Sequence, residues 1–305
     1  MSALEMRGVR VAFSGRPVLD GVDLEVPEGG VFGFIGRNGA GKTTTMKVAL
    51  GLLRPDAGEA RVLGERVRFG DSRTNREVGY LPDVPEFYGH MTAERYLALC
   101  GEVAGMGRAE TRSRAAELLD LVGLASARGR VSGFSRGMRQ RLGIAQALLS
   151  RPRLVICDEP TSALDPVGRR EVLDLLAEIG RGATVLFSTH VLSDVERVCD
   201  RVAILHGGRV AMAGALADLR GARGGNRVRV EVAGAADLDA LLARPELVPF
   251  AAGAERDGLS CTLRAADGRA LMGARLEALR AAGVCPVSVG AVEPTLEDLF
   301  CEEEI

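Results

Sequence analysis

A glycine-rich segment near the N-terminus constrains this chain more than any other feature. Residues 36–44 read Gly-Arg-Asn-Gly-Ala-Gly-Lys-Thr-Thr and fit the pattern G-x-x-x-x-G-K-[ST] of a phosphate-binding loop. Glycines let such a backbone turn its N–H groups towards an anion. In loops of this kind the lysine, here Lys42, reaches the β- and γ-phosphates, and the hydroxyl after it, here Thr43, holds Mg²⁺. The sequence therefore predicts a site for the phosphates of a nucleotide.

The residues around the loop supply the context that phosphate binding requires. Residues 31–35 form a short apolar run typical of a buried parallel strand, and residues 43–53 lack proline and favour a helix. This order would place the phosphates at a helix N-terminus, where free N–H groups and the helix dipole favour negative charge. We therefore expect a strand, a phosphate loop and a helix in residues 31–53.

The composition narrows the class of protein. Of the 305 residues, 47% are hydrophobic and 26% are charged, as in ordinary soluble globular proteins, and the net charge of −2 gives no reason to expect a nucleic-acid partner. The apolar stretches are shorter than the roughly 18 residues of a transmembrane helix, and the N-terminus lacks a signal-peptide pattern, so we expect a cytoplasmic protein. The six cysteines form no C-x-x-C pair, which argues against a zinc site or a disulfide framework.

Strand and helix patterns alternate through most of the chain and predict an α/β architecture. Alternating apolar and polar residues predict two antiparallel strands, at residues 8–13 and 21–27. Apolar residues at three- and four-residue spacing predict three consecutive helices, at 92–105, 108–122 and 135–150. Short apolar runs predict strands of a parallel sheet at 153–157, 183–187 and 202–206. A helix is predicted between the first two strands, at 167–180.

A change in composition near residue 220 predicts a linker and a second, smaller domain. Glycines concentrate in residues 221–226, and the chain beyond them again alternates strand and helix patterns. The expected strands and helices of this small α/β domain lie at 227–232, 235–243, 259–264, 269–282 and 286–292. We expect residues 1–222 to form the nucleotide-binding domain and residues 223–305 an accessory domain.

Two carboxylates follow the apolar strand at 153–157. At the carboxyl end of a parallel strand, Asp158 and Glu159 would face the phosphate loop. We expect Asp158 to hold Mg²⁺, directly or through water, and Glu159 to polarise the attacking water as a general base. The alternative, an acidic surface loop, fits poorly with the four apolar residues that lead into the pair.

A serine and a glycine open the helix predicted at 135–150. Ser135 is well placed to cap the helix N-terminus, and this purely structural role is one interpretation. The functional interpretation is that the helix start binds a phosphate, with Gly137 allowing a close approach.

Taken together, these motifs resemble those of the ATP-binding cassette (ABC) ATPases. The resemblance covers residues 1 to about 220 in the order typical of the family. Residues 36–44 match the Walker A motif, residues 134–138 the signature motif and residues 158–159 the Walker B motif with the catalytic glutamate. Residues 162–165 match the D-loop, and residues 188–190 match the switch-histidine loop. The resemblance implies a P-loop NTPase fold of the ABC type, with a parallel core sheet, an antiparallel N-terminal sheet and a helical subdomain at about 84–150. The small α/β C-terminal domain would follow it.

The resemblance also implies a mechanism. Cassettes of this family work as head-to-tail dimers with two ATP molecules between them, so Lys42 and Thr43 of one subunit would face Ser135 and Gly137 of the other. The residues implied to bind ATP are Phe13, Gly36, Arg37, Asn38, Gly39, Ala40, Gly41, Lys42, Thr43, Thr44, Ser135, Gly137 and Asp165.

The catalytic group implied by the resemblance consists of Glu159 as the base, Lys42, and His190, which would contact the γ-phosphate and the attacking water. Thr43 and Asp158 would hold Mg²⁺. Phe13 stands where the family usually has an aromatic residue that stacks on adenine, although an ordinary core phenylalanine is the alternative.

Two positions depart from the commonest family pattern. The signature motif reads Phe-Ser-Arg-Gly-Met and looks like the variant Tyr-Ser-Lys-Gly-Met of drug- and ion-exporting systems. Asp83 aligns with the glutamine of the Q-loop, which usually contacts Mg²⁺ and links the ATP site to the membrane subunit. Aspartate is a hard oxygen ligand for Mg²⁺, but it is shorter than glutamine and charged.

The resemblance implies an ATPase subunit that powers a membrane exporter through a separate permease, at the inner face of the cell membrane. Residues 293–300 resemble the closing segment of antibiotic-exporter cassettes, so a small hydrophobic drug or antibiotic is the leading substrate, with an ion, lipid or peptide still open. The dimer partner is a second copy or a paralogous cassette. The C-terminal domain either regulates or stabilises the dimer or is a packing extension.

Other classes of nucleotide-binding protein fit less well. A soluble ABC protein that acts on ribosomes or DNA is the main alternative, but Lys42 and Lys47 are the only lysines, so a second Walker A motif is absent. Neither lysine follows an asparagine, which excludes the guanine motif Asn-Lys-x-Asp of GTPases. The loop also lacks the G-x-G-x-x-G pattern of dinucleotide-binding dehydrogenases.

Overall fold

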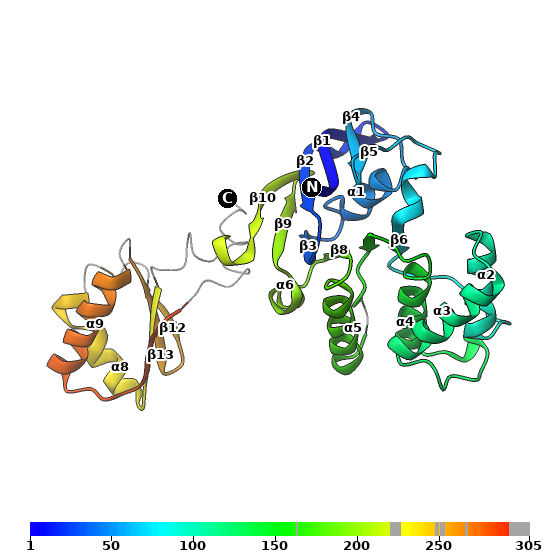
Figure 1. Cartoon of the computed structure of the whole chain (residues 1–305). Helices are drawn as coiled ribbons and strands as arrows, with labels where there is room; N and C mark the ends of the chain where they lie inside the picture. The colour runs from blue at the N-terminus through cyan, green and yellow to red at the C-terminus, as the bar shows by residue number, and fades with distance from the viewer. Residues whose placement is uncertain (163, 220–226, 248–249, 251–253, 266–267, 293–305) are drawn as a thin grey trace. The chain divides into compact units, whose positions relative to one another are not determined.

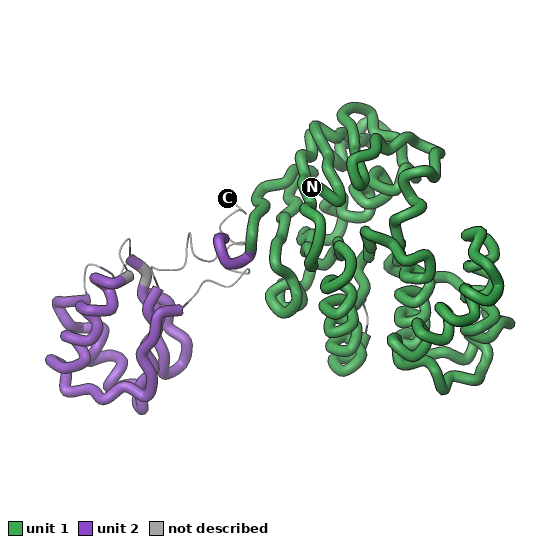
Figure 2. The backbone as a smooth tube through the Cα atoms, in the orientation of Figure 1, with its two compact units in different colours: residues 1–215 green, residues 216–305 purple. Residues whose placement is uncertain are grey.

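The computed structural model describes the chain except residues 163, 220–226, 248–249, 251–253, 266–267 and 293–305. The chain divides into two compact units, residues 1–215 and residues 216–305 (Figure 2). The sequence places the domain boundary a little later, after residue 222. The expected linker at 221–226 and the exporter-like segment at 293–300 lie outside the described residues.

The N-terminal part of unit 1 is an antiparallel sheet. Its strand order is β2-β1-β4-β5, with bounds Ser2–Phe13 for β1, Arg16–Pro27 for β2, Ala57–Val62 for β4 and Glu65–Arg66 for β5. In β1, buried residues such as Val9 and Val11 alternate with exposed ones, because only one face of the sheet is covered. The antiparallel strands predicted near the N-terminus are confirmed and are longer than predicted.

The second sheet of unit 1 is mostly parallel and carries the phosphate loop. Its order is β10-β9-β3-β8-β7-β6, and only β10 runs antiparallel to its neighbour. The bounds are Val31–Ile35 for β3, Val78–Leu81 for β6, Leu154–Cys157 for β7, Thr184–Thr189 for β8, Arg201–His206 for β9 and Arg209–Ala215 for β10. All residues of β3, β7 and β8 are buried, which explains the apolar runs of β3 and β7 and the apolar centre of β8. The predicted parallel sheet is confirmed.

Helices cover both faces of the parallel sheet. The hydrophobic core between the two sheets includes Met46 and Ala49 of α1 (Lys42–Ala49), while α5 (Pro166–Ile179) and α6 (Leu192–Val198) pack on the other side, against β8 and β3 (Figure 1). The helix predicted at 43–53 is wrong at its end, because Leu50 is its C-cap and Gly51 takes a left-handed φ of 66°.

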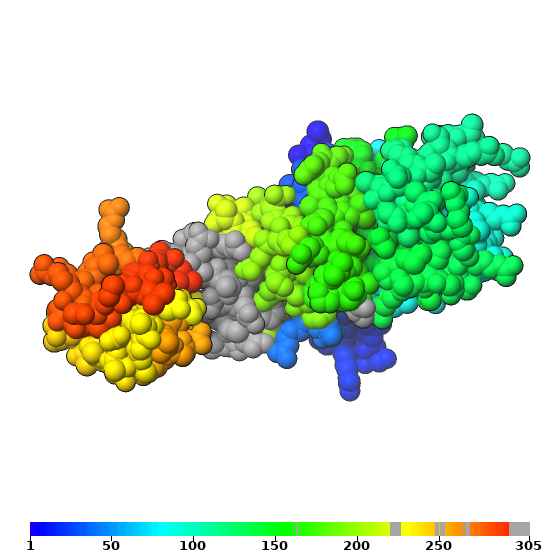
Figure 3. All heavy atoms as spheres, turned by 90° about the horizontal axis from the view of Figure 1, so that it is seen from below, coloured from blue at the N-terminus to red at the C-terminus, as the bar shows by residue number. Residues whose placement is uncertain are grey.

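Three further helices form a subdomain within unit 1. They are α2 (Ala93–Val103), α3 (Arg108–Leu121) and α4 (Arg136–Ala147), and they lie together at one end of unit 1 in Figures 1 and 3. The 3₁₀ turns Arg73–Glu77 and Val131–Gly133 lie near β6 and before α4. The three predicted helices are confirmed, except that α4 ends at Ala147 rather than at residue 150.

Unit 2 has the split β-α-β-β-α-β arrangement. The elements are β11 (Arg227–Val232), α8 (Ala235–Leu242), β12 (Glu255–Asp257), β13 (Ser260–Arg264), α9 (Gly268–Ala282) and β14 (Pro286–Ala291). The antiparallel sheet has the order β12-β13-β11-β14, and its buried side chains form a core of their own with those of α8 and α9. The predicted strands and helices are confirmed, and β12 is an additional strand.

Candidate nucleotide-binding site

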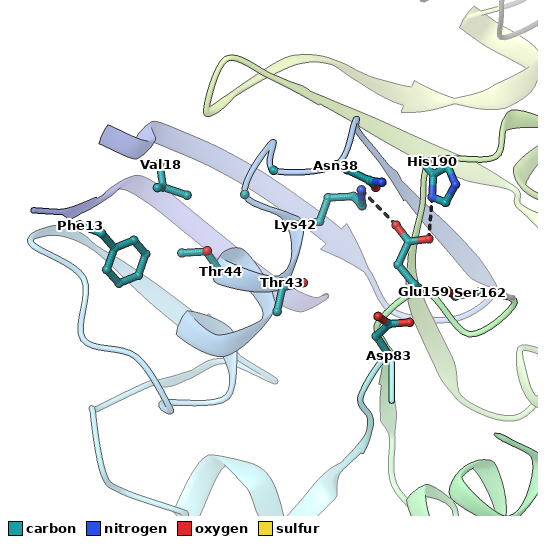
Figure 4. Close-up of a pocket in the computed structure, with 12 residues that line it drawn as sticks. Phe13, Val18, Asn38, Lys42, Thr43, Thr44, Asp83, Glu159, Ser162 and His190 are labelled. Carbon is teal, nitrogen blue, oxygen red and sulfur yellow. Dashed lines mark hydrogen bonds and ion pairs between the residues drawn. The ribbon is translucent and has the colours of Figure 1, made fainter. Parts of the chain in front are cut away.

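The predicted phosphate loop opens onto a pocket at the carboxyl ends of β3, β6, β7 and β8. The pocket has a volume of about 510 Å³ and is shown in Figure 4. A crevice at the carboxyl ends of parallel strands is the usual place for a ligand in an α/β sheet. Its lining residues are Phe13, Val18, Asn38, Gly39, Gly41, Lys42, Thr43, Thr44, Asp83, Glu159, Ser162 and His190.

Backbone geometry explains the glycines of the loop. Gly41 has a φ of 108°, and a Cβ atom on it would lie 2.6 Å from Leu19 Cδ2. A Cβ atom on Gly36 would lie 2.9 Å from the carbonyl oxygen of Leu205. Both positions therefore need glycine, one for its conformation and both for space. Arg37 and Ala40 lie in the same loop, joined by a backbone hydrogen bond.

The loop leads directly into α1. Gly41 is the N-cap residue and offers no side chain to the first turn, so the amides there are available to an anion. The side chain of Lys42 folds back over the loop, and its Nζ donates to the carbonyl oxygens of Gly36 at 2.5 Å and Arg37 at 3.3 Å. Thr43 and Thr44, the next residues of α1, also line the pocket.

The two consecutive carboxylates after β7 have different environments. Asp158 is only 2% exposed, and its Oδ1 accepts a hydrogen bond from Ser188 Oγ at 2.7 Å. Glu159 has a left-handed φ of 47°, which is uncommon for a residue with a side chain, and its side chain lines the pocket. Its backbone N–H donates to the same Ser188 Oγ at 3.0 Å. Ser188 therefore fixes both residues, a role that the sequence analysis missed.

The Glu159 carboxylate lies between two nitrogen groups of the predicted site (Figure 4). Its Oε1 is 3.1 Å from Lys42 Nζ, and its Oε2 is 3.0 Å from His190 Nδ1. An ionised carboxylate only accepts hydrogen bonds, so the second contact needs a proton on His190 Nδ1. The structure thus brings together the three residues that the sequence predicts as catalytic, from α1 and from the ends of β7 and β8.

Two other titratable groups near the site stay protonated at neutral pH. Burial and the nearby Asp158 carboxylate raise the pKa of Tyr80 to about 12. The same two causes raise the pKa of the Cys157 thiol to about 12. Neither group is therefore a base at neutral pH.

The predicted magnesium ligands have different positions. Thr43 and Asp83 are exposed and line the pocket, whereas Asp158 is buried next to Ser188. Within the described part of the chain, histidine, cysteine and acidic residues form no cluster of three or more that could hold a metal. Mg²⁺ usually binds proteins through one or two carboxylates and completes its shell with water and substrate phosphates, so this sparse set of oxygens fits Mg²⁺.

Phe13 lies at the end of the pocket away from Glu159 and His190 (Figure 4). It is 50% exposed and lines the pocket with Val18, so it does not belong to the hydrophobic core. An exposed aromatic ring is available for stacking on a base. Val18 is a further lining residue that the sequence analysis did not name.

Six of the residues predicted to bind ATP do not line this pocket: Gly36, Arg37 and Ala40, which belong to the phosphate loop, and three residues from other segments. Ser135, Gly137 and Asp165 line a second hollow of about 440 Å³. Ser135 caps α4, since Met138 N donates to its Oγ at 3.2 Å, and Asp165 caps α5 through Gly168 N at 2.9 Å. The structure therefore does not bring these residues together with Lys42 in one chain.

Known proteins share this fold and these motifs. A family model described as ABC transporter matches residues 19–162. The daunorubicin resistance ATP-binding protein DrrA3 of Streptomyces coeruleorubidus is 34% identical over 301 residues, which cover 98% of this chain and 95% of that protein. The chain belongs to the ABC transporter ATP-binding family. This membership confirms the predicted ABC-type P-loop fold.

Two further relatives match the cassette itself. An uncharacterized ABC transporter ATP-binding protein of Bacillus subtilis strain 168, YxlF, is 45% identical over 200 residues. The match covers 65% of this chain and 66% of that protein, just under two thirds of its length. A solved ATP-binding subunit of an ABC transporter superposes with a TM-score of 0.64 at 36% identity, over 72% of this chain and 93% of the solved one. Among the helices that the structure describes, none combines the length and the apolar sequence of a membrane-spanning segment.

Proposed function

We propose that this cassette binds ATP with Mg²⁺ in the pocket of Figure 4 and hydrolyses it. The observation that supports the proposal most strongly is the position of the Glu159 carboxylate, within 3.1 Å of Lys42 Nζ and 3.0 Å of His190 Nδ1 at the mouth of a phosphate loop. A phosphate-binding lysine, a carboxylate base and a histidine thus share one small volume, as water attack on a γ-phosphate requires.

ATP changes the partner of Lys42. The Lys42 side chain is 6% exposed, and its Nζ is paired with the Glu159 carboxylate. The β- and γ-phosphates carry more negative charge than one carboxylate, so Lys42 Nζ turns towards them together with the amides of the loop. Glu159 is then free to accept a proton from the attacking water, and His190 contacts the γ-phosphate and orients that water. Phe13 stacks on the adenine.

Magnesium would be held by the Thr43 hydroxyl with the carboxylates of Asp83 and Asp158, the latter directly or through water. Held there, Mg²⁺ would supply positive charge to balance that of the ATP phosphates. The exposed position of Asp83 in the pocket supports its part in this set, and the hydrogen bond from Ser188 keeps the Asp158 carboxylate oriented.

We further propose that two cassettes form a head-to-tail dimer, with a second copy or a paralogue as the partner. Ser135 and Gly137 of one chain would then contact the γ-phosphate bound by Lys42 of the other, with Asp165 near the same interface. The separate hollow that these residues line supports this proposal, because a single chain leaves them away from its own phosphate loop.

The likeness to DrrA3 supports a role in drug export. That protein is named for daunorubicin resistance, and the match covers 98% of this chain. We propose that the cassette powers efflux of a drug, an antibiotic or another small molecule through a separate permease. It would work at the inner face of the cell membrane, and no nucleic-acid partner is expected.

Replacement of the base tests the proposed hydrolysis. Glu159→Gln preserves the size of the side chain and removes its basicity, so the turnover of ATP should fall by at least ~10²-fold while ATP binding is retained. The measurement is phosphate release by the purified full chain with saturating ATP and Mg²⁺, next to a binding titration. Glu110→Gln, on the exposed side of α3, is the matched control. Normal turnover by Glu159→Gln would refute the assignment of the base.

A further inference from the structure

A buried network behind the pocket joins the two loops that carry Glu159 and His190. Its centre is Asp194 of α6, which is 3% exposed. The Asp194 Oδ2 atom accepts a hydrogen bond from the hydroxyl of Thr161 at 2.7 Å. Arg169 of α5 donates to both carboxylate oxygens, at 2.7 Å and 2.9 Å. None of these three side chains lines the nucleotide pocket.

The network closes a ring through the chain. Thr161 stands two positions after Glu159, in a turn where Ser162 N donates to the Glu159 carbonyl at 2.9 Å. Asp194 stands four positions after His190, in the first turn of α6. The ring is completed on the pocket side by the 3.0 Å contact between His190 and Glu159. The two loops are therefore connected twice, by the contact between His190 and Glu159 in the pocket and by the hydrogen bond between Thr161 and Asp194 behind it.

The backbone of Glu159 needs such support. Its left-handed φ of 47° is unfavourable for a residue with a Cβ atom and persists only where the surroundings enforce it. On one side, Ser188 Oγ accepts from the Glu159 amide. On the other side, the Thr161 hydroxyl is the first side-chain anchor, and it is fixed to Asp194.

Charge and burial make this anchor rigid. The bidentate contact with Arg169 balances the charge of the Asp194 carboxylate and fixes its plane, so the oxygen that accepts the hydrogen bond from the Thr161 hydroxyl has a set direction. Thr161 is itself only 4% exposed. Water cannot readily replace a hydrogen bond at this depth.

We infer that Asp194 is a positioning residue: through Thr161 it holds the loop of Glu159 in register with the loop of His190. The inference rests on the proposed hydrolysis, because it assigns to Asp194 the alignment of the base with the histidine. Neither Asp194 nor Thr161 lines the nucleotide pocket, so loss of the link should affect the chemical step and leave nucleotide binding intact.

Thr161→Val tests this link with little change of shape. Valine fills the same volume without the hydroxyl, and Asp194 keeps its charge partner Arg169. We expect kcat for ATP to fall at least ~10-fold with KM and nucleotide affinity retained, because a small misplacement of a catalytic group is costly. Thr161→Ser should restore the hydrogen bond and most of kcat. Thr111→Val, which removes a buried hydroxyl from α3, is the control for stability.

A second measurement on the nucleotide-free chain does not depend on activity. The chain has only three histidines, so the imidazole NMR signals of His190 can be assigned by comparison with His190→Gln. We expect Thr161→Val to shift these signals and Thr161→Ser to leave them nearly unchanged. Unchanged His190 signals in Thr161→Val, or equal defects in both Thr161 variants, would overturn the inference. A native chain without ATP turnover would instead refute the proposed function, while the NMR comparison still tests the link.

Discussion

At the residue scale, burial gives two adjacent acids different surroundings. Asp158 and Glu159 follow one another in the sequence, yet one is enclosed beside Ser188 and the other faces the pocket. Successive side chains of an extended strand point to opposite sides, and the left-handed φ of Glu159 ends that alternation. This difference supports the roles proposed above, with Asp158 as an oriented oxygen ligand and Glu159 as the base.

The carboxylate of Asp83 leads to a prediction about magnesium. Asp83→Asn keeps the size of the side chain and removes its charge, so a direct metal contact would weaken. We expect the Mg²⁺ concentration for half-maximal ATP hydrolysis to rise by roughly 10-fold, at the lower end of the losses seen when groups that support a metal site are removed. The measurement is a Mg²⁺ titration of activity at fixed ATP.

Glu86→Gln is the matched control for Asp83, because Glu86 is also exposed and lies nearby in the same loop. A Mg²⁺ requirement that is the same for Asp83→Asn, Glu86→Gln and the native chain would show that Asp83 does not contact the ion. The site set would then reduce to Thr43 and Asp158.

The sequence predicted most residues of the pocket because the phosphate loop and its companions have strong local patterns. It missed Ser188 as the group that holds Asp158 and Glu159. It also missed Asp194, whose partner Thr161 lies 33 positions away along the chain. Hydrogen bonds between distant segments depend on the order of the strands, which local periodicity does not contain.

At the scale of elements, the helices and the short strands with clear apolar runs, such as β3 and β7, were predictable, whereas β6 was not. The strand β6 has only four residues, and it is stabilised by parallel pairing with β7 and by packing against α4. A Cβ atom on Gly79 would collide with the carbonyl oxygen of Ala147 in α4, so the close packing requires glycine there. Glycine is unfavourable inside a strand, so a local sequence pattern that contains Gly79 does not predict one, although packing against α4 requires glycine at this position.

Helix α4 provides a stability prediction. The Ser135 hydroxyl caps its N-terminus, so Ser135→Ala should lower the free energy of unfolding by about 1 kcal/mol, within the usual range for loss of such a cap. Ser135→Asp retains a capping oxygen and should keep most of the stability. The measurement is denaturant unfolding of the nucleotide-free chain.

Comparison of the two Ser135 variants separates structure from catalysis. Ser135→Asp places a negative charge where the proposed dimer brings a γ-phosphate, so it should lose ATP turnover while it stays stable. Ser150→Ala, at an exposed serine after α4, is the control for the loss of a hydroxyl. A Ser135→Ala variant as stable as the native chain would contradict the capping role.

At the scale of the whole molecule, the chain contains two units with separate cores. The core of unit 1 is built from both of its sheets and α1, and the core of unit 2 from its own sheet with α8 and α9. The sequence predicted most elements of both units from their hydrophobic periodicity, but it missed the strands β4, β5, β6, β10 and β12. Within unit 1, Lys42 and Ser135 line different hollows, so one chain offers only half of each proposed ATP site.

The central claim, that this cassette powers a membrane transporter, is tested most directly by capture of the full chain from detergent-solubilised native membranes, with quantitative mass spectrometry of the proteins that come with it. The account predicts a stoichiometric membrane protein with several transmembrane spans, which would be the permease. The same capture from the soluble fraction is the control. Recovery of ribosomal proteins, or of no membrane protein at all, would contradict the transporter assignment.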